Sequence, residues 1–153
     1  MRAVAIAPDG SWLASGGDDG LVRVWDLATG QQRAALRGHR GAVHAVAIAP
    51  DGSWLASGGD NGLVRVWDLA TGRQRAALGG RGRAVRAVAT GRDGTWLASA
   101  DYDGLVRIWD LATGGISAVM RVDGPLEDCA WSPSSESLAA AGDAGLYHFA
   151  FKA

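Results

Sequence analysis

The chain has 153 residues, the size of one domain, and 48% of them are hydrophobic and 20% charged, which is typical of a folded globular protein. Its 15 Lys and Arg against 16 Asp and Glu leave no basic excess, so we expect no nucleic-acid partner. The single Cys129 excludes an intrachain disulfide. The opening apolar run stops at Pro8, and no run approaches the roughly 20 apolar residues of a membrane span. We expect a cytoplasmic protein without membrane contact, metal or cofactor.

The dominant feature of the sequence is an internal repeat of 42 residues. Residues 2–43 and 44–85 align without a gap and differ at only seven positions. A third copy follows with more changes, and a fourth is one residue shorter before Pro133 and stops early. A period of about 40–50 residues that contains several short strands is typical of one blade of a β-propeller. We therefore divide the chain into four blades, at residues 1–41, 42–83, 84–124 and 125–153.

In the first copy the residue pattern predicts four short strands. Residues 3–7 are apolar, which suits an inner strand that is buried on both faces. A Pro-Asp-Gly turn at 8–10 leads to a second strand at 12–15. Residues 21–25 alternate apolar with polar, as in a half-buried strand, and residues 32–36 form a more polar outer strand. The sequence predicts an all-β propeller fold of four-stranded antiparallel blades, with the last blade incomplete.

Signature dipeptides recur in register with these strands. A Trp-Asp pair ends the third strand of each of the first three copies, at Trp25, Trp67 and Trp109. A Gly38-His39 dipeptide precedes the second copy, and an Asp-Gly or Asn-Gly turn precedes each of the three third strands. With these motifs the chain resembles the WD-repeat β-propeller family, in a bacterial form with near-identical repeats. The resemblance covers essentially the whole chain and implies a rigid interaction scaffold that is not an enzyme.

The resemblance also implies a buried hydrogen-bonded group of four side chains in each blade: the His after Gly, a Ser on the second strand, an Asp in the next turn and the Trp. No blade has all four, because the first lacks the His, the second has Asn61 for Asp, and the third has Arg81 for His. In the fourth, Ala140, Ala144 and Ala150 stand at the Ser, Asp and Trp positions. The members that remain are Ser15, Asp19 and Trp25; His39, Ser57, Asn61 and Trp67; and Ser99, Asp103 and Trp109.

Binding residues of the family concentrate on the top face, around the central channel. One kind of position lies at the start of the inner strand, and the other lies just before the turn Asp. Mapped by register, the resemblance places a protein-binding surface at Arg2, His44, Arg86, Glu127, Asp18, Asp60, Tyr102 and Asp143. The mixed charges favour a polar protein or peptide partner, and we expect His44 at the surface.

Other chemistry is less well supported by the sequence. The acidic turns at 18–19 and 60–61 invite a metal or acid–base interpretation, but Asp is common there because its side chain stabilises turns. The Gly-rich segment 15–18 lacks the Gly-Lys-Ser/Thr and the helix of a phosphate loop. Besides a scaffold, two hypotheses remain open: a sensor fragment of a larger bacterial signalling protein, and a piece excised from or engineered on a longer propeller.

The strands at the two ends of the chain do not complete one blade. The first copy begins at its inner strand and the fourth ends at its third strand. Four blades of a seven- or eight-bladed propeller cover about half a circle, which would expose an apolar face at each end. We therefore expect two copies to close an eight-bladed ring as a homodimer.

Overall fold

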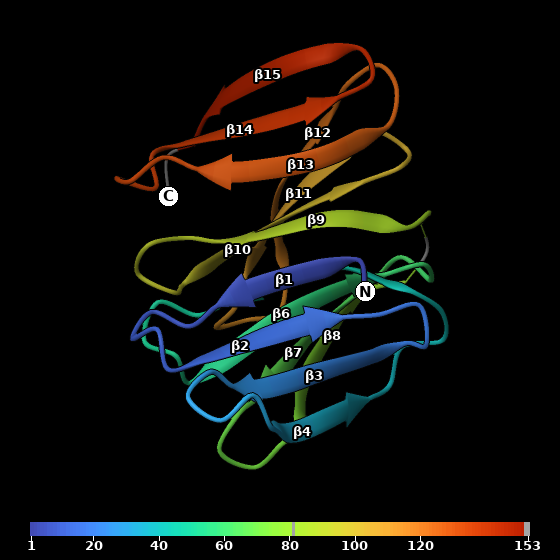
Figure 1. Cartoon of the computed structure of the whole chain (residues 1–153). Coiled ribbons are helices and arrows are strands. Elements are labelled where there is room, and N and C mark those ends of the chain that lie inside the picture. Colours follow the sequence, from blue (N-terminus) through green and yellow to red (C-terminus); the bar gives the residue numbers. More distant parts are fainter. Residues whose placement is uncertain (81, 152–153) are drawn as a thin grey trace.

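The computed structural model describes residues 1–80 and 82–151, and all regular elements in this part of the chain are β-strands. They form four antiparallel sheets, which we call blades 1 to 4 (Figure 1). Blades 1 and 2 comprise β1 (Ala3–Ile6), β2 (Trp12–Gly16), β3 (Leu21–Asp26) and β4 (Gln32–Arg37), then β5 (Val43–Ile48), β6 (Trp54–Gly59), β7 (Leu63–Asp68) and β8 (Gln74–Gly79). Blades 3 and 4 comprise β9 (Val85–Thr90), β10 (Trp96–Asp101), β11 (Leu105–Asp110) and β12 (Ile116–Arg121), then β13 (Leu126–Trp131), β14 (Ser137–Gly142) and β15 (Gly145–Ala150). The predicted all-β fold, with a three-stranded last blade, is confirmed.

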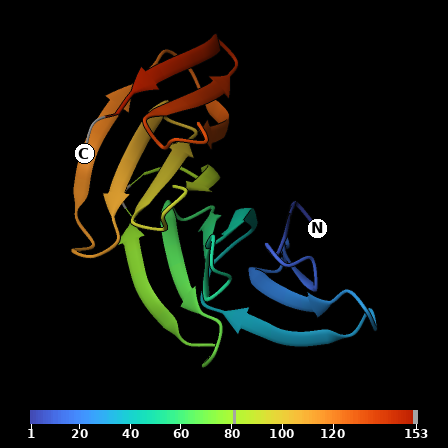
Figure 2. The same cartoon turned by 90° about the vertical axis from the view of Figure 1, so that its left-hand side faces the viewer.

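The blades follow one another along an open arc, in chain order (Figure 2). Their inner strands β1, β5, β9 and β13 are neighbours in that order. Between blades 1 and 2, the backbone N–H of Val43 donates a 2.9 Å hydrogen bond to the carbonyl of Gly17. This close approach needs glycine on the second strand, because a Cβ on Gly16 would lie 2.6 Å from the Val43 side chain. Gly58 meets Val85 in the same way at 2.5 Å.

The acid of each Trp-Asp pair closes the turn after the third strand. Asp26 Oδ1 accepts hydrogen bonds from the backbone N–H groups of Ala28 (2.9 Å) and Thr29 (3.1 Å), and Asp68 repeats this pattern in blade 2. Asp26 Oδ2 also pairs with Arg33 on the outer strand at 2.9 Å. The carboxylate therefore orders the turn and holds the outer strand, which explains its recurrence without any chemistry.

The hydrophobic core lies between the blades. Trp12 and Leu36 of blade 1 pack in one cluster with Leu55 and Trp67 of blade 2. The equivalent residues of blades 2 and 3 form a second cluster, and a third joins blades 3 and 4. Each internal blade is therefore apolar on both faces and depends on both neighbours for its burial.

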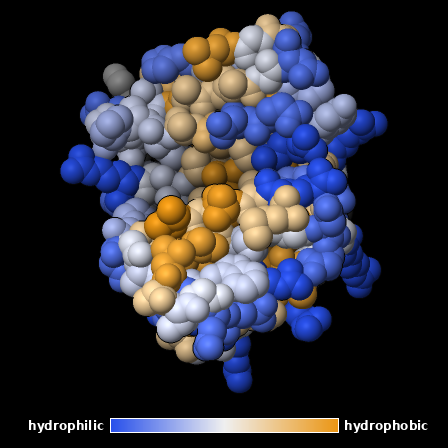
Figure 3. All heavy atoms as spheres, viewed as in Figure 1, coloured by the Kyte–Doolittle hydropathy of each residue, from blue (hydrophilic) through white to orange (hydrophobic). Residues whose placement is uncertain are grey.

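One face of blade 1 has no covering blade in the described chain. Val4 and Ile6 are 58% and 64% exposed, whereas their equivalents Val46 and Ile48 pack against blade 1. Figure 3 shows hydrophobic side chains gathered over β1 on this side of the molecule. The expectation that residues 3–7 are buried on both faces is therefore wrong for this blade.

Blade 4 departs from the expected register in β15. The turn between β14 and β15 is one residue shorter than the turn between β10 and β11. As a result Phe149 pairs with Leu138, as Trp109 pairs with Leu97. The expectation that Ala150 stands at the Trp position is wrong, because the shorter turn moves the whole strand by one residue.

Relative to the expected register, this shift exchanges the two faces of β15, since side chains alternate along a strand. Tyr147 and Phe149 pack toward the core that blade 4 shares with blade 3. Leu146 and His148 lie on the other, free face, where Leu146 is 77% exposed. Ser137 on β14 takes the place that Trp has in blades 1 to 3. The free face of blade 4 is therefore small and polar compared with the faces that the other blades present.

The repeat provides a matched test of this architecture. Trp25 and Trp67 each donate a 2.9 Å hydrogen bond to a serine, but Trp67 is 2% exposed and Trp25 is only half-buried. We expect Trp67→Phe to lower the free energy of unfolding by about 2–3 kcal/mol and Trp25→Phe by about 1 kcal/mol, measured by denaturant unfolding. Equal losses would contradict an uncovered blade 1 and would indicate that another molecule covers Trp25 in solution.

Candidate functional site

Most residues expected on the top face are joined in ion pairs, and we call the predicted set the top-face ring: Arg2, His44, Arg86, Glu127, Asp18, Asp60, Tyr102 and Asp143. Within blade 1, Arg2 pairs with Asp18, and at the same positions of blade 2, His44 pairs with Asp60. Arg86 instead reaches across to Glu127 of blade 4, with Nε and Nη2 at 3.0 Å and 2.9 Å from Oε2. The structure thus brings six of the eight residues into contacts that register alone could not reveal. Their binding role stays a prediction.

The pairs of blades 1 and 2 act as one electrostatic group. The hydrogen bond from the Arg2 guanidinium, with its charge, lowers the pKa of Asp18. The hydrogen bond with His44 lowers the pKa of Asp60, and the charge of Arg2 in blade 1 lowers this pKa further. The side chain of His44 is 10% exposed, so most of its ring is covered, and its role as a contact position stays a prediction.

Tyr102 and Asp143 are the two ring members outside these pairs. Tyr102 replaces the Asp of the first two blades, is 42% exposed, and has the Arg83 guanidinium 5.6 Å from its ring centroid, a cation–π contact. The exposed Asp143 forms no ion pair with another described residue. These two side chains are therefore the members most available to a partner.

Blade 2 holds the most complete buried hydrogen-bonded group. His39 Nε2 and Ser57 Oγ are 2.7 Å apart, and the indole N–H of Trp67 donates to the same oxygen at 2.9 Å. Because the indole already donates to Oγ, the serine hydroxyl can donate to Nε2 of a neutral imidazole. The group links the turn before blade 2 to two of its strands.

The remaining polar atoms of this group are poorly satisfied. Burial, reinforced by the charge of Arg65, lowers the pKa of His39 to about 4, and nearby Asn61 opposes the shift only in part. His39 Nδ1 and Arg65 Nε lack hydrogen-bond partners among the described residues. Asn61 Oδ1 accepts a long 3.4 Å bond from the Leu63 backbone. Asn in place of Asp therefore leaves blade 2 without the carboxylate that both donors need.

In blade 1 the expected members are present without a histidine. The Trp25 indole donates to Ser15 Oγ at 2.9 Å, and Asp19 Oδ2 pairs with Arg23 at 2.6 Å. That arginine occupies the position of Arg65 in blade 2. Asp19 therefore supplies in blade 1 the counter-charge that Asn61 cannot supply in blade 2.

Blade 3 uses a different carboxylate from the expected one. Ser99 accepts the Trp109 indole N–H at 3.0 Å, but Asp103 faces Arg83 at 3.6 Å, outside the buried group. Asp101, 1% exposed, pairs with the equivalent arginine of this blade, Arg107, at 2.5 Å. The prediction for Asp103 is therefore wrong, because Asp101 lies inside the blade. The Arg81 prediction falls outside the described residues.

Sequence reasoning missed Asp101, although a signal was present. Asp101 stands where the first two copies have Gly17 and Gly59. In blade 2 that glycine leaves room for His39, since a Cβ on Gly59 would lie 2.6 Å from Nδ1. In blade 3 a carboxylate stands in place of glycine at this buried position. This difference indicates that the space taken by the imidazole ring of His39 in blade 2 is used differently in blade 3.

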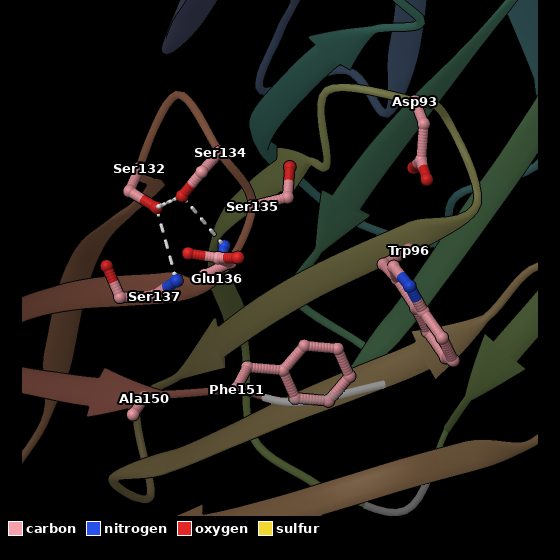
Figure 4. A pocket seen from close by; sticks show the side chains of 9 residues that line it. All are labelled: Asp93, Trp96, Ser132, Ser134, Ser135, Glu136, Ser137, Ala150 and Phe151. Carbon is pink, nitrogen blue, oxygen red and sulfur yellow. Dashed lines mark hydrogen bonds between the residues drawn. The ribbon is translucent and has the colours of Figure 1, made fainter.

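A hollow of about 760 Å³ lies between blades 3 and 4 (Figure 4). Two carboxylates, Asp93 and Glu136, lie on its wall with several serines of the loop before β14. The Phe151 ring meets Trp96 edge to face at 5.2 Å. Sequence analysis did not find this hollow, because it depends on how Phe151 folds back onto the neighbouring blade.

A comparison with protein families agrees with this geometry. A family model described as WD domain, G-beta repeat matches residues 1–26, 30–68 and 72–110, about two-thirds of the chain. The chain belongs to the WD-repeat family. The first match ends with the third strand of blade 1, and the second and third each run from the outer strand of one blade to the third strand of the next. The outer strand of blade 3 and all of blade 4 lie outside the matches. WD-repeat domains are protein-interaction scaffolds, and this coarse role applies to the chain.

Curated relatives resemble the chain over less than one repeat. Ribosome biogenesis protein erb1 of Botryotinia fuckeliana is 66% identical over 32 residues, which is 21% of this chain and 4% of that protein. The protein of the same name from Coccidioides immitis is 69% identical over 32 residues, with the same coverage. That from Aspergillus niger is 63% identical over 37 residues, 24% of this chain and 5% of that protein. The chain thus matches about a twentieth of each relative's length.

No helix in the described part of the chain is long and apolar enough to cross a membrane. No group of three or more His, Cys, Asp or Glu side chains there has the arrangement of a metal site. The free Cys129 is buried, and this burial raises the pKa of its thiol to about 12.

Restoring the missing carboxylate of blade 2 should stabilise the protein. Asn61→Asp places a negative charge beside Arg65 and the unpartnered Nδ1 of His39, and we expect about 1 kcal/mol of added stability at neutral pH. Asp19→Asn in blade 1 is the reciprocal control and should lower stability, because Arg23 loses its partner. The free energy of unfolding of both variants is measured by denaturant unfolding. Changes of the same sign in the two variants would contradict this account of the buried group.

The histidine of blade 2 should make stability depend on pH in a defined window. The folded pKa of His39 is about 4 against an ordinary 6.5, so between these values the unfolded chain binds a proton that the folded chain does not. Stability should therefore fall as the pH is lowered from 6.5 to 4, by about 1–2 kcal/mol since solvent partly screens the ring.

A variant isolates this contribution. His39→Gln cannot titrate and should lose the slope in this window, as followed by urea unfolding at several pH values. Asp18, Asp19 and Asp60 have lowered pKa values, so they lose their contribution below the ordinary 3.8, in a separate range. An unchanged slope in His39→Gln would assign the effect to another group.

Proposed function

We propose that the chain is a non-catalytic, cytoplasmic scaffold that binds a protein or peptide through the top-face ring. Membership of the WD-repeat family supports the scaffold role. The observation that carries the choice of surface is that six of the eight ring members form three side-chain pairs, Arg2–Asp18, His44–Asp60 and Arg86–Glu127, which hold polar side chains in place on a rigid frame. Binding residues are usually found on such loops at the edge of a stable frame.

The chemistry of the ring favours a cationic or polar partner segment. Within the ring, two arginines face four carboxylates, and the exposed Asp143 is unpaired in the described chain. Tyr102 offers an exposed aromatic face one blade away. A peptide with an Arg or Lys beside an apolar residue would fit both side chains. The carboxylate of Asp143 would pair with the cation, and the phenol ring of Tyr102 would contact the apolar residue.

The homodimer that closes an eight-bladed ring stays a prediction. It requires the free face of blade 4 to cover blade 1 of a second copy, and blade 4 presents Ser137 and His148 where covering blades present Trp and Val or Ile. Such an interface would bury less apolar area than the internal ones, so we expect the association to be weak. The likeness to ribosome biogenesis proteins is shorter than one repeat and adds no partner to the proposal.

The test uses a phage-displayed library of random peptides selected on the purified chain. We expect enrichment of peptides with Arg or Lys, and loss of that enrichment in a Tyr102→Ala, Asp143→Lys double variant with an unchanged melting temperature. The matched controls are Arg33→Glu and Arg75→Glu on the outer strands, which should select the same peptides as the parent chain. Enrichment that survives the double variant and is lost in the controls would move the site to the outer strands.

A second variant tests the ion pairs of the ring. Exchanging the charges of the pair between blades, with Arg86→Glu and Glu127→Arg together, keeps the pair while reversing the local field. We expect stability to be retained and the selected peptides to change. Selection of an unchanged peptide set would show that this pair is structural and takes no part in binding.

A further inference from the structure

The outer strands β4, β8 and β12 are each paired with a neighbouring strand on one side only. Along the other edge, half of the backbone N–H and C=O groups meet no described strand, and such an edge can accept a further strand. Natural sheets commonly protect an edge of this kind with charged side chains. Because the three strands occupy the same positions of the repeat, the differences between them show how each edge is protected.

The outer strands of blades 1 and 2 carry this protection. Their second residues, Arg33 and Arg75, pair with the carboxylates of Asp26 and Asp68 at 2.9 Å and 3.2 Å. In both strands a glutamine precedes the arginine and two alanines follow it. Each of these edges therefore has a cation that is held by an acid of the same blade, and its exposed side chains are polar or small.

The outer strand of blade 3 has lost the protection. Ser117 stands at the arginine position, and Ile116 and Val119 replace the glutamine and the second alanine. These two apolar side chains are 51% and 52% exposed. No charged residue occurs between Asp110 and Arg121 in the sequence. Of the three outer strands, β12 therefore has the most apolar and least protected edge, and its β-branched residues favour an extended backbone.

The same exchange leaves the acid of blade 3 without a cation. Asp110 Oδ1 accepts a 2.9 Å hydrogen bond from the backbone N–H of Ala112, as Asp26 and Asp68 do in their own turns. Those two acids use the other oxygen, Oδ2, to hold an arginine, whereas Asp110 forms no ion pair with another described residue. The backbone N–H of Asp110 donates to the carbonyl of Gly115 at 2.9 Å, so the acid lies beside the start of β12.

We propose that the outer edge of β12 binds an extended segment of another protein as an added β-strand, and that an Arg or Lys of this segment pairs with Asp110. The cation takes the place that an arginine of the same blade has in blades 1 and 2. Backbone hydrogen bonds along the edge supply the affinity, and Ile116 and Val119 contact apolar residues of the segment. Two strands separate β12 from β9, which carries Arg86, so this surface is distinct from the top-face ring.

The test uses the full chain and a short fluorescent peptide in which threonine and valine alternate around one central arginine. We expect saturable binding by fluorescence anisotropy, and slower hydrogen exchange of the β12 backbone amides in the complex than in the free chain. A peptide with glutamine in place of the arginine should bind about threefold more weakly, the loss expected of one exposed ion pair. A peptide with every backbone amide N-methylated should not bind, because it can donate no backbone hydrogen bond.

Two exchanges between outer strands test the assignment to β12. Ser117→Arg gives this strand the residue of the other two and provides Asp110 with a cation of its own blade, so we expect peptide binding to be lost while the melting temperature is kept. The triple variant Gln74→Ile, Arg75→Ser, Ala77→Val gives β8 the residues of β12, and we expect two bound peptides per chain in place of one. Unchanged binding by Ser117→Arg would overturn the proposal, and so would a single bound peptide in the triple variant.

The role of the carboxylate is tested by a matched pair of variants. Asp110→Asn keeps the turn hydrogen bond through its amide oxygen and should remove the preference for the arginine peptide over the glutamine peptide. Asp26→Asn in blade 1 should leave this preference unchanged. Equal preferences in the two variants would show that Asp110 takes no part in binding and would overturn its pairing with the cation.

Two further measurements keep the β12 edge apart from other surfaces. The Tyr102→Ala, Asp143→Lys double variant should bind the peptide as the parent chain does, and loss of binding there would place the peptide on the top-face ring and overturn the proposal. A second copy of the chain is the competing occupant, since two β12 edges can also pair with each other. Light scattering should give the same mass for the peptide-free parent and the Ser117→Arg chain. A dimer that Ser117→Arg dissociates would assign the edge to self-association and overturn the proposal.

Discussion

The packing of one blade against the next is the interaction on which the rest of this molecule depends. No single sheet encloses a core, and the most buried side chains lie in clusters shared by two blades. Stability in such a chain is a sum over neighbours, as in other repeat proteins. Blades of nearly identical sequence therefore differ in what they contact, which is why the same tryptophan is buried in blade 2 and half-buried in blade 1.

The polar interior of the blades follows from one recurring arginine. A partly buried guanidinium needs an acceptor, and leaving it unpaired is costly. Blade 1 supplies Asp19 from the turn, and blade 3 supplies Asp101 from the strand. In blade 2 the arginine has no carboxylate partner among the described residues and lies near His39, whose pKa is lowered first by burial and then by the charge of Arg65. In blades 1 and 2 the residue in the turn thus decides whether the arginine has a counter-charge.

Much of the fold could be predicted because the repeat fixes strand length, turn position and the alternation of faces at once. The pairing of side chains could not. Register placed Arg86 on the top face but not its contact with Glu127, which depends on the spacing of two blades. Asp101 could not be predicted from the family motif, because that motif has its acid in the turn after the second strand. The register of β15 was predicted wrongly, because the turn before it is one residue shorter and contains no motif residue that shows where the deletion lies. The missed features are all side-chain contacts or a single deletion.

That shortened turn gives the assembly a direction. Relative to the expected register it turns Tyr147 and Phe149 toward blade 3 and leaves His148 beside Leu146 on the free face, so this face is less apolar than those of the other blades. The opposite end keeps the full pattern on β1 and β2. A head-to-tail contact at the free face of blade 4 would bury less apolar surface than the contacts between the described blades, and such contacts are the ones that produce open-ended filaments. One residue of turn length thus decides which side chains the last described sheet offers to a neighbour.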